Sequence, residues 1–182
     1  MKDSELALAC LLAETGPTTG YGLSLVAKER GMERWAGLGQ TSVYKGVRGL
    51  VAARVAISST QVDKHGRGPA GTLVELTNHG LATTRAEVAE AIGHGPEQST
   101  RFRIALSGAD LLGPEMTARL LRQRSLAITE RLHEVAGARL ASPDPGRSLG
   151  RRLLFDYVDA ALRHELVAID RLTGLAQEGL VP

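Results

Sequence analysis

Residues 40–77 constrain the fold of this chain more than any other segment. They begin with TSVYKGVRGLVAA, in which apolar side chains recur at helical spacing and polar or basic side chains occupy the opposite side. Two short stretches with strand character follow, AISSTQV and TLVELT, and DKHGRGPAG between them is a turn by its glycines and proline. A polar and basic helix that leads into a two-stranded hairpin is typical of a winged helix-turn-helix, whose helix enters the major groove of DNA.

The distribution of charge agrees with this interpretation better than its total does. The formal net charge of the 182-residue chain is only +2. Within residues 40–80, however, five Lys and Arg side chains face two carboxylates, whereas basic and acidic side chains cancel in residues 81–182. The positive charge is therefore concentrated on the segment that would bind phosphates.

Several other classes of protein find little support. The single cysteine, Cys10, excludes an internal disulfide and lies in LALACLLA, which predicts a buried thiol. The first apolar run, residues 6–13, is too short to cross a bilayer, so we expect a soluble, cytoplasmic protein without a membrane partner. The five histidines lack metal-ligand spacing, and no P-loop, GxGxxG or Ser-His-Asp pattern is present. We expect no enzyme activity, no cofactor and no metal.

The overall pattern predicts a mainly α fold with a small β-hairpin. Helices are expected over residues 3–14, 18–30, 41–53, 78–92, 101–106, 114–140 and 147–176. The Gly-rich stretch MERWAGLG is expected to connect the second helix to the third, and Gly46 and Gly49 to lie on the outward face of the third. GHGP breaks the fourth helix and predicts two domains. These are a winged helix-turn-helix DNA-binding domain, residues 1–93, and a helical dimerisation domain, residues 97–182.

The last helix carries two apolar stripes. One contains Leu154, Val158, Ala161, Ile169 and Leu172, and the other contains Leu153, Tyr157 and Leu166. One stripe can pack on the chain's own long helix. The other is left for a partner, which predicts a homodimer joined through the C-terminal helices.

Four segments, in the same order along the chain, resemble motifs of the PadR family of bacterial transcriptional regulators. They are LALACLLAETGPTTGYGL, the tryptophan before the third helix, TSVYKGVRGL and GRGPAGTLVELTNHG. The residues that carry the resemblance are Gly16, Pro17, Gly20, Tyr21, Leu23, Trp35, Ser42, Tyr44, Arg48, Leu50, Gly68, Pro69, Leu76, Thr77 and Gly80. Lys45 replaces the proline usual in the family, and Ala70, Gly71, Thr72 and Leu73 replace basic and aromatic residues of the second wing strand.

The resemblance implies a homodimeric repressor that binds double-stranded DNA at an inverted-repeat operator. It also implies release by a small aromatic or cationic effector. In such a dimer the two recognition helices must match half-sites roughly 34 Å apart, so an effector that changes their spacing lowers affinity.

Ten residues are candidates for DNA contact: Thr19, Tyr21, Thr41, Ser42, Tyr44, Lys45, Arg48, Lys64, His65 and Arg67. Arg48 is the best candidate for a base edge, because its fork matches guanine, and the others suit phosphate contacts. Packing between helices is the alternative for Tyr21 and Tyr44. The candidate ligand platforms are Trp35, Phe102, Phe155 and Tyr157, for which core packing is the alternative.

A winged-helix scaffold that binds protein without specific DNA binding is the alternative function. It is favoured by the low net charge and by the weakly basic wing. Replacement of Lys45 and Arg48 separates the two, since a regulator loses DNA whereas a scaffold keeps its partner.

Overall fold

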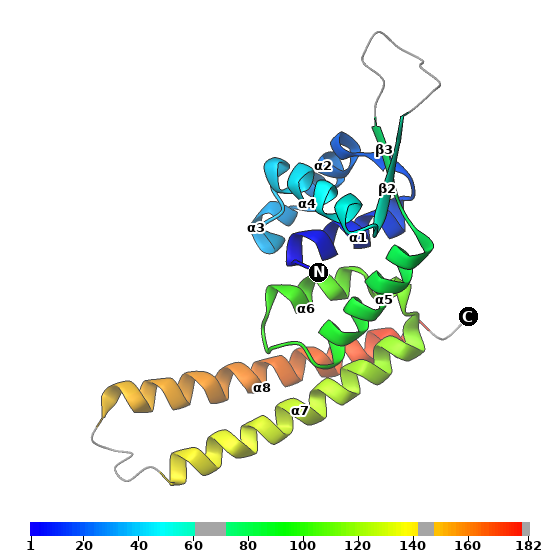
Figure 1. Ribbon diagram of the computed structural model, residues 1–182. Coiled ribbons are helices and arrows are strands. Elements are labelled where there is room, and N and C mark those ends of the chain that lie inside the picture. The colour runs from blue at the N-terminus through cyan, green and yellow to red at the C-terminus, as the bar shows by residue number, and fades with distance from the viewer. Residues whose placement is uncertain (61–71, 142–147, 180–182) are drawn as a thin grey trace.

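A computed structural model of the chain describes residues 1–60, 72–141 and 148–179. Its helices are α1 (Asp3–Thr15), α2 (Gly20–Glu29), α3 (Met32–Ala36), α4 (Gln40–Ala52), α5 (Asn78–Gly93), α6 (Thr100–Ser107), α7 (Pro114–Leu140) and α8 (Leu149–Glu178) (Figure 1). Its strands are β1 (Thr18–Thr19), β2 (Ala56–Thr60) and β3 (Thr72–Leu76), and a 3-10 turn covers Ala109–Leu111. The predicted mainly α fold with a small β element is confirmed. Across these ranges, no helix has the length and apolar character that spanning a membrane requires.

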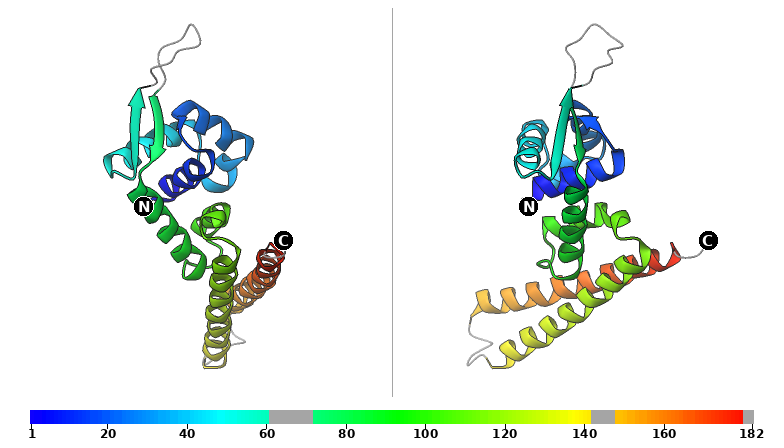
Figure 2. Two further views of the ribbon diagram at one scale, coloured as in Figure 1. Left: turned by 90° about the vertical axis from the view of Figure 1, so that its right-hand side faces the viewer. Right: turned by 45° about the vertical axis from the view of Figure 1, so that its right-hand side comes forward.

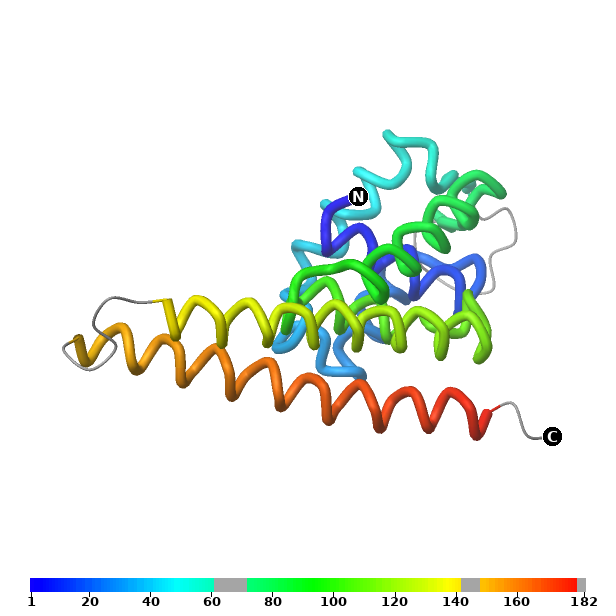
Figure 3. Tube along the Cα trace, turned by 90° about the horizontal axis from the view of Figure 1, so that it is seen from below, coloured from blue at the N-terminus to red at the C-terminus, as the bar shows by residue number. Residues whose placement is uncertain are grey.

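The elements form three levels, which are visible in Figure 1 and in both views of Figure 2. The sheet, α2, α3 and α4 lie at one end. Helices α5 and α6 lie in the middle, and α7 and α8 cross the opposite end. Figure 3 shows α7 and α8 side by side and antiparallel along most of their length. Helix α4, with β2 and β3, therefore lies at the opposite end of the molecule from α7 and α8, which form the C-terminal tail.

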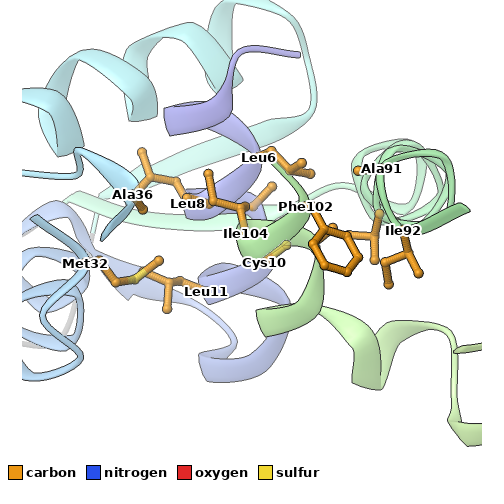
Figure 4. Close-up of a cluster of buried hydrophobic side chains, with 14 of the residues drawn as sticks. Leu6, Leu8, Cys10, Leu11, Met32, Ala36, Ala91, Ile92, Phe102 and Ile104 are labelled. Atoms are coloured by element: carbon orange, nitrogen blue, oxygen red, sulfur yellow. The ribbon is translucent and has the colours of Figure 1, made fainter. Parts of the chain in front are cut away.

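Helix α1 is the centre of the core because it is apolar on all sides. Residues 6–12 are all buried, and the helix packs against α4, α5 and α6. Figure 4 shows side chains of α1 between Met32 of α3 and Ile92 of α5. Cys10 is buried here as predicted, and desolvation raises its pKa to about 12, so the thiol stays neutral.

Short polar signals fix the ends of several helices. Thr19 Oγ1 accepts a hydrogen bond from the backbone N–H of Gly22 at the start of α2, 3.0 Å away. Thr77 Oγ1 accepts one from Gly80 N at the start of α5, 2.8 Å away. Pro114 begins α7. The predicted bounds of α7, residues 114–140, are confirmed.

The strands form one antiparallel sheet in the order β1-β3-β2. Ser58 pairs with Val74 in the wing, and Thr18 pairs with Val74 from the other side. The order α1, β1, α2, α4, β2, β3 with this register is that of a winged helix-turn-helix. The sequence predicted only the hairpin of β2 and β3. It did not predict β1, because a strand of two residues is too short to show an alternating pattern.

Helix α3 lies inside the stretch that was expected to be a plain connection. It occupies the five residues between Gly31 and Gly37, both of which have a left-handed backbone, with φ of 63° and 64°. Met32 and Ala36 bury its inner side. The expectation was wrong because one helical turn between two glycines leaves almost no periodic signal.

The predicted division at residues 93–96 coincides with the end of α5. Helix α6, the first element beyond it, packs on α1 and α3 as well as on α5. The division into residues 1–93 and 97–182 stays a prediction.

A buried ion pair fixes the junction between these parts. The Arg124 Nη2 atom of α7 lies 2.7 Å from Glu165 Oε1 of α8, and the two side chains are 2% and 6% exposed. Arg124 also donates to the backbone oxygens of Gly95 and Pro96, and its guanidinium lies 4.0 Å from the centre of the Phe102 ring. The backbone N–H of Gln98 donates to Glu165 Oε2, 2.9 Å away. One guanidinium therefore joins α6, α7, α8 and the segment that follows α5.

Replacing Arg124 by Ala is expected to lower the free energy of unfolding by about 3–5 kcal/mol, because Glu165 is left buried without its partner. The double variant Arg124→Met, Glu165→Leu should recover much of that loss, since neither charge remains. Chemical denaturation followed by circular dichroism measures both. Arg131→Ala is the control, because the Arg131–Glu134 pair is exposed, and no measurable change is expected there. Equal losses in Arg124→Ala and Arg131→Ala would contradict this role.

Candidate nucleic-acid interface

Helix α4 has one face in the core and one face in solvent. Val43 and Leu50 are buried on the inner face. Thr41, Lys45 and Arg48 follow one another at helical spacing on the exposed face, and Ser42 is half-buried beside them. The structure thus brings the predicted contact residues of α4 onto one surface, while their role in DNA binding stays a prediction.

The cations of this face have no acidic partner among the described residues. Within the part of the chain that the structure describes, no carboxylate forms an ion pair with Lys45 or Arg48. Many other basic side chains are paired: Arg30, for example, binds the Glu14 carboxylate with its two Nη atoms, which lowers the pKa of that carboxyl. Two basic side chains with no acidic partner on one helix face suit a polyanion.

The start of α2 adjoins this face through Tyr44. The Tyr44 ring covers Gly20 so closely that a Cβ placed there would lie 3.0 Å from Tyr44 Cε1. Tyr44 is nevertheless 44% exposed, and Tyr21 is 60% exposed. Tyr44 therefore packs on a neighbouring helix and also reaches the surface, so both interpretations of this residue hold in part. Thr19 is half-buried, and its hydroxyl caps α2.

The wing consists of β2 and β3, and β2 packs beside α4. Its predicted contact residues Lys64, His65 and Arg67 lie outside the described residues. Their contact with DNA stays a prediction.

Gly46 is buried and Gly49 is half-buried, so the two glycines do not lie on the outward face of α4 where they were expected. A Cβ at Gly46 would lie 2.4 Å from Leu8 Cδ1, and a Cβ at Gly49 would lie 2.5 Å from Glu5 Oε1. Both glycines therefore face α1 and allow α4 to approach it closely. The expectation was wrong because the spacing of the apolar residues did not reveal that α1 crosses this side of α4.

A groove of about 660 Å³, which no pattern in the sequence indicated, lies between α2, α4 and the sheet. Its lining residues are Thr19, Gly20, Tyr21, Tyr44, Val47, Arg48, Val51, Ala52, Ser58, Thr72 and Val74. Four of them, Thr19, Tyr21, Tyr44 and Arg48, are also predicted DNA contacts. The groove and the candidate DNA surface therefore overlap.

The four predicted ligand platforms are spread over three helices. Trp35 lies in α3, where its indole N–H donates to the backbone oxygen of Arg30. Phe102 of α6 is buried beneath the Arg124 guanidinium, which agrees with core packing. Phe155 and Tyr157 lie in the first half of α8, and Tyr157 is 70% exposed. A ligand role for these residues stays a prediction. Among the described side chains, no three from His, Cys, Asp and Glu are grouped closely enough to hold a metal ion.

The fold and this face define a winged helix-turn-helix protein with a helical tail. Two solved structures are similar over almost the whole chain. Bacillus subtilis PadR in complex with operator DNA is 17% identical, with a TM-score of 0.43 over 94% of this chain and 98% of that chain. B. subtilis PadR in complex with p-coumaric acid is 15% identical, with a TM-score of 0.40 over 97% and 99% of the two chains. Both are structures of PadR. The PadR family, whose motifs the sequence resembles, takes its name from this protein.

No protein-family model and no curated protein matches the chain. The winged-helix assignment rests on the order of the elements and on the strand register, which are properties of this chain alone.

Replacing Gly46 by Ala is expected to lower the free energy of unfolding by about 1–3 kcal/mol, because the new methyl group overlaps the buried Leu8. Gly137→Ala in α7 is the matched control, since no atom lies within 4 Å of its Cβ position. That substitution should raise stability by up to about 1 kcal/mol through helix propensity. Thermal and chemical unfolding measure the pair, and a Gly46→Ala protein as stable as Gly137→Ala would refute the close approach of α4 to α1.

Proposed function

We propose that this protein is a DNA-binding transcriptional regulator that acts as a homodimeric repressor and is released by a small-molecule effector. One observation carries the proposal: the exposed face of α4, beside the wing, holds Lys45 and Arg48 with no carboxylate partner among the described residues. In a winged helix-turn-helix this is the helix that enters the major groove.

The chemistry of the two cations gives them different roles. The planar fork of Arg48 can donate two parallel hydrogen bonds to a guanine edge, so it can contribute to sequence recognition. The ammonium of Lys45 is a point charge on a flexible stem and suits a phosphate oxygen. Thr41 and Ser42, near the start of the helix, add hydroxyl groups that can donate hydrogen bonds to phosphate oxygens of the DNA.

The tail supports dimerisation at a distance from this face. Leu153, Leu154 and Tyr157 are each at least 60% exposed in the first half of α8, and Val167 is 72% exposed further along. Leu154 and Val158 of the first stripe line a groove of about 330 Å³ together with Val135 and Ala138 of α7. Both stripes therefore contribute apolar surface that a second copy can cover. Because this surface lies at the end opposite α4 (Figure 1), such a dimer leaves both recognition helices open.

In this proposal, the aromatic or cationic effector binds one arrangement of the dimer better than the other. The population then shifts only by the difference between the two affinities. A rotation at the tail changes the distance between the recognition helices, which must match half-sites roughly 34 Å apart.

The wild-type protein should bind a duplex from its own promoter region in preference to random duplex, with steep salt dependence. The double variant Lys45→Ala, Arg48→Ala should bind at least about tenfold more weakly, because a bidentate base contact and a phosphate contact are lost. The slope of log affinity against log salt should fall by about one for each phosphate contact removed. Fluorescence anisotropy at several salt concentrations measures both quantities.

The control is Arg85→Ala, Arg122→Ala, which removes the same charge from exposed positions of α5 and α7. Its affinity should stay near that of the wild type. Equal weakening in the two double variants would indicate a non-specific charge effect. No preference for the promoter duplex in the wild-type protein would refute a specific regulator and favour the scaffold alternative.

Analytical ultracentrifugation of the wild-type protein should give the molecular mass of a dimer. Leu153→Asp, Tyr157→Asp should shift it toward the monomer, because two carboxylates would have to be buried in an apolar interface. Leu81→Asp is the control, since Leu81 is an exposed leucine of α5, away from the tail. A wild-type chain that remains a monomer at high concentration refutes the proposed assembly.

A further inference from the structure

The groove between α2, α4 and the sheet exists because several of the side chains that α4 and the strands contribute to its lining are small. Val47, Val51 and Ala52 come from α4, and Ser58 and Val74 come from β2 and β3. None of these side chains is long enough to fill the space between the helix and the sheet. Val74 is buried at the floor, and Val47 and Val51 are partly buried against the core. The hollow is therefore held open by the packed framework around it.

The groove has the character of a small-molecule site. Its volume of about 660 Å³ lies within the range of roughly 300–1,000 Å³ that is usual for such sites. Apolar side chains line its interior, and the two phenol rings of Tyr21 and Tyr44 stand at its α2 side. Water against this apolar floor is readily displaced by a flat apolar body. Aromatic rings at the edge favour a ligand that is itself aromatic.

The charge in the groove determines whether it favours an anionic or a cationic ligand. Among the described residues that line it, Arg48 is the one charged side chain, and no described carboxylate pairs with Arg48. A guanidinium binds a carboxylate or sulfonate through two parallel hydrogen bonds and also stacks on aromatic rings. A cationic ligand would meet this charge with no carboxylate in the described lining to balance it.

We propose that this groove binds a planar aromatic anion, with its rings against Val47, Val51 and Val74 and its acidic group on Arg48. Because Arg48, Tyr44 and Tyr21 are also candidate DNA contacts, the bound anion excludes DNA from the same face. The exclusion of DNA rests on the proposed function, whereas binding of the anion does not.

The test uses the full chain and two fluorescent probes. Anilinonaphthalene sulfonate is an aromatic anion, and N-phenylnaphthylamine has the same two ring systems without the sulfonate. Ala52→Phe should fill the groove and weaken the anionic probe at least about tenfold. Ala53→Phe is the matched control, because Ala53 is the next residue and is also exposed but does not line the groove. Ser58→Phe and Ser59→Phe form a second pair from β2, with circular dichroism to verify folding.

Arg48→Gln separates the two probes. It should weaken binding of the sulfonate probe by about tenfold and leave binding of the neutral probe nearly unchanged, because only the sulfonate uses the guanidinium. Binding of the probe to the exposed apolar tail would be the same in all of these variants. The proposal is overturned if Ala52→Phe and Ala53→Phe, both folded, bind the sulfonate probe equally, or if Arg48→Gln weakens the two probes alike.

Competition with duplex DNA then tests the link to regulation. The promoter duplex should displace the sulfonate probe from the wild-type protein, and the probe should lower DNA affinity for Ala53→Phe but not for Ala52→Phe. If the protein binds no DNA while the variants alter probe binding as expected, the groove stands and the proposed function fails. If DNA binds and the probe does not compete, exclusion fails while the regulator stands.

Discussion

The Arg124–Glu165 ion pair is the constraint on which the arrangement of the two ends depends. Two charges in a dry interior are costly to desolvate, and they persist only where their hydrogen-bonding groups are satisfied. Here the remaining donors of Arg124 meet the backbone oxygens of Gly95 and Pro96, and Glu165 accepts the N–H of Gln98. Each of these partners is available only when α7 and α8 stand correctly against the segment after α5. The pair therefore favours one arrangement of the tail more strongly than apolar contacts alone would, since methyl groups can slide past one another, whereas Arg124 Nε and Nη2 must both reach Glu165 Oε1.

Helix α5 carries this constraint from the tail to the wing. At its start, a Cβ at Gly80 would lie 1.8 Å from the Val55 backbone oxygen, so α5 touches the chain just before β2. At its end, Gly93 lies against Leu120 of α7, with 3.1 Å from its Cβ position to Cδ2. Helix α5 is therefore closely packed at both ends. In the proposed regulator it is the element through which a change in the packing of two tails would reach α4 and the wing.

The sequence allowed prediction of those features whose cause is local. The bounds of α7 and the cap at Thr77 follow from signals within a few residues, and α4 followed from its own periodicity. The inward direction of Gly46 depended on where α1 crosses α4, and no pattern within α4 contains that information. Arg124 and Glu165 are separated by 41 residues, and each resembles an ordinary surface charge of a polar helix. The groove was equally hidden, because it arises where short side chains from α4, β2 and β3 meet. The exposed face of α4 could be predicted, whereas the hollow beside it could not.

The two proposed routes of release place different demands on the molecule. Release through helix spacing needs a coupling free energy that passes from the tail through Arg124 and α5 to both recognition helices. Release by an anion in the groove needs no conformational change, because the ligand and DNA use the same guanidinium and the same tyrosine rings. In that case apparent DNA affinity falls with ligand concentration by simple mass action, independently of how the tails are packed. The overlap at Arg48 also limits adaptation, because in this proposal any change at Arg48 alters the binding of both ligands at once.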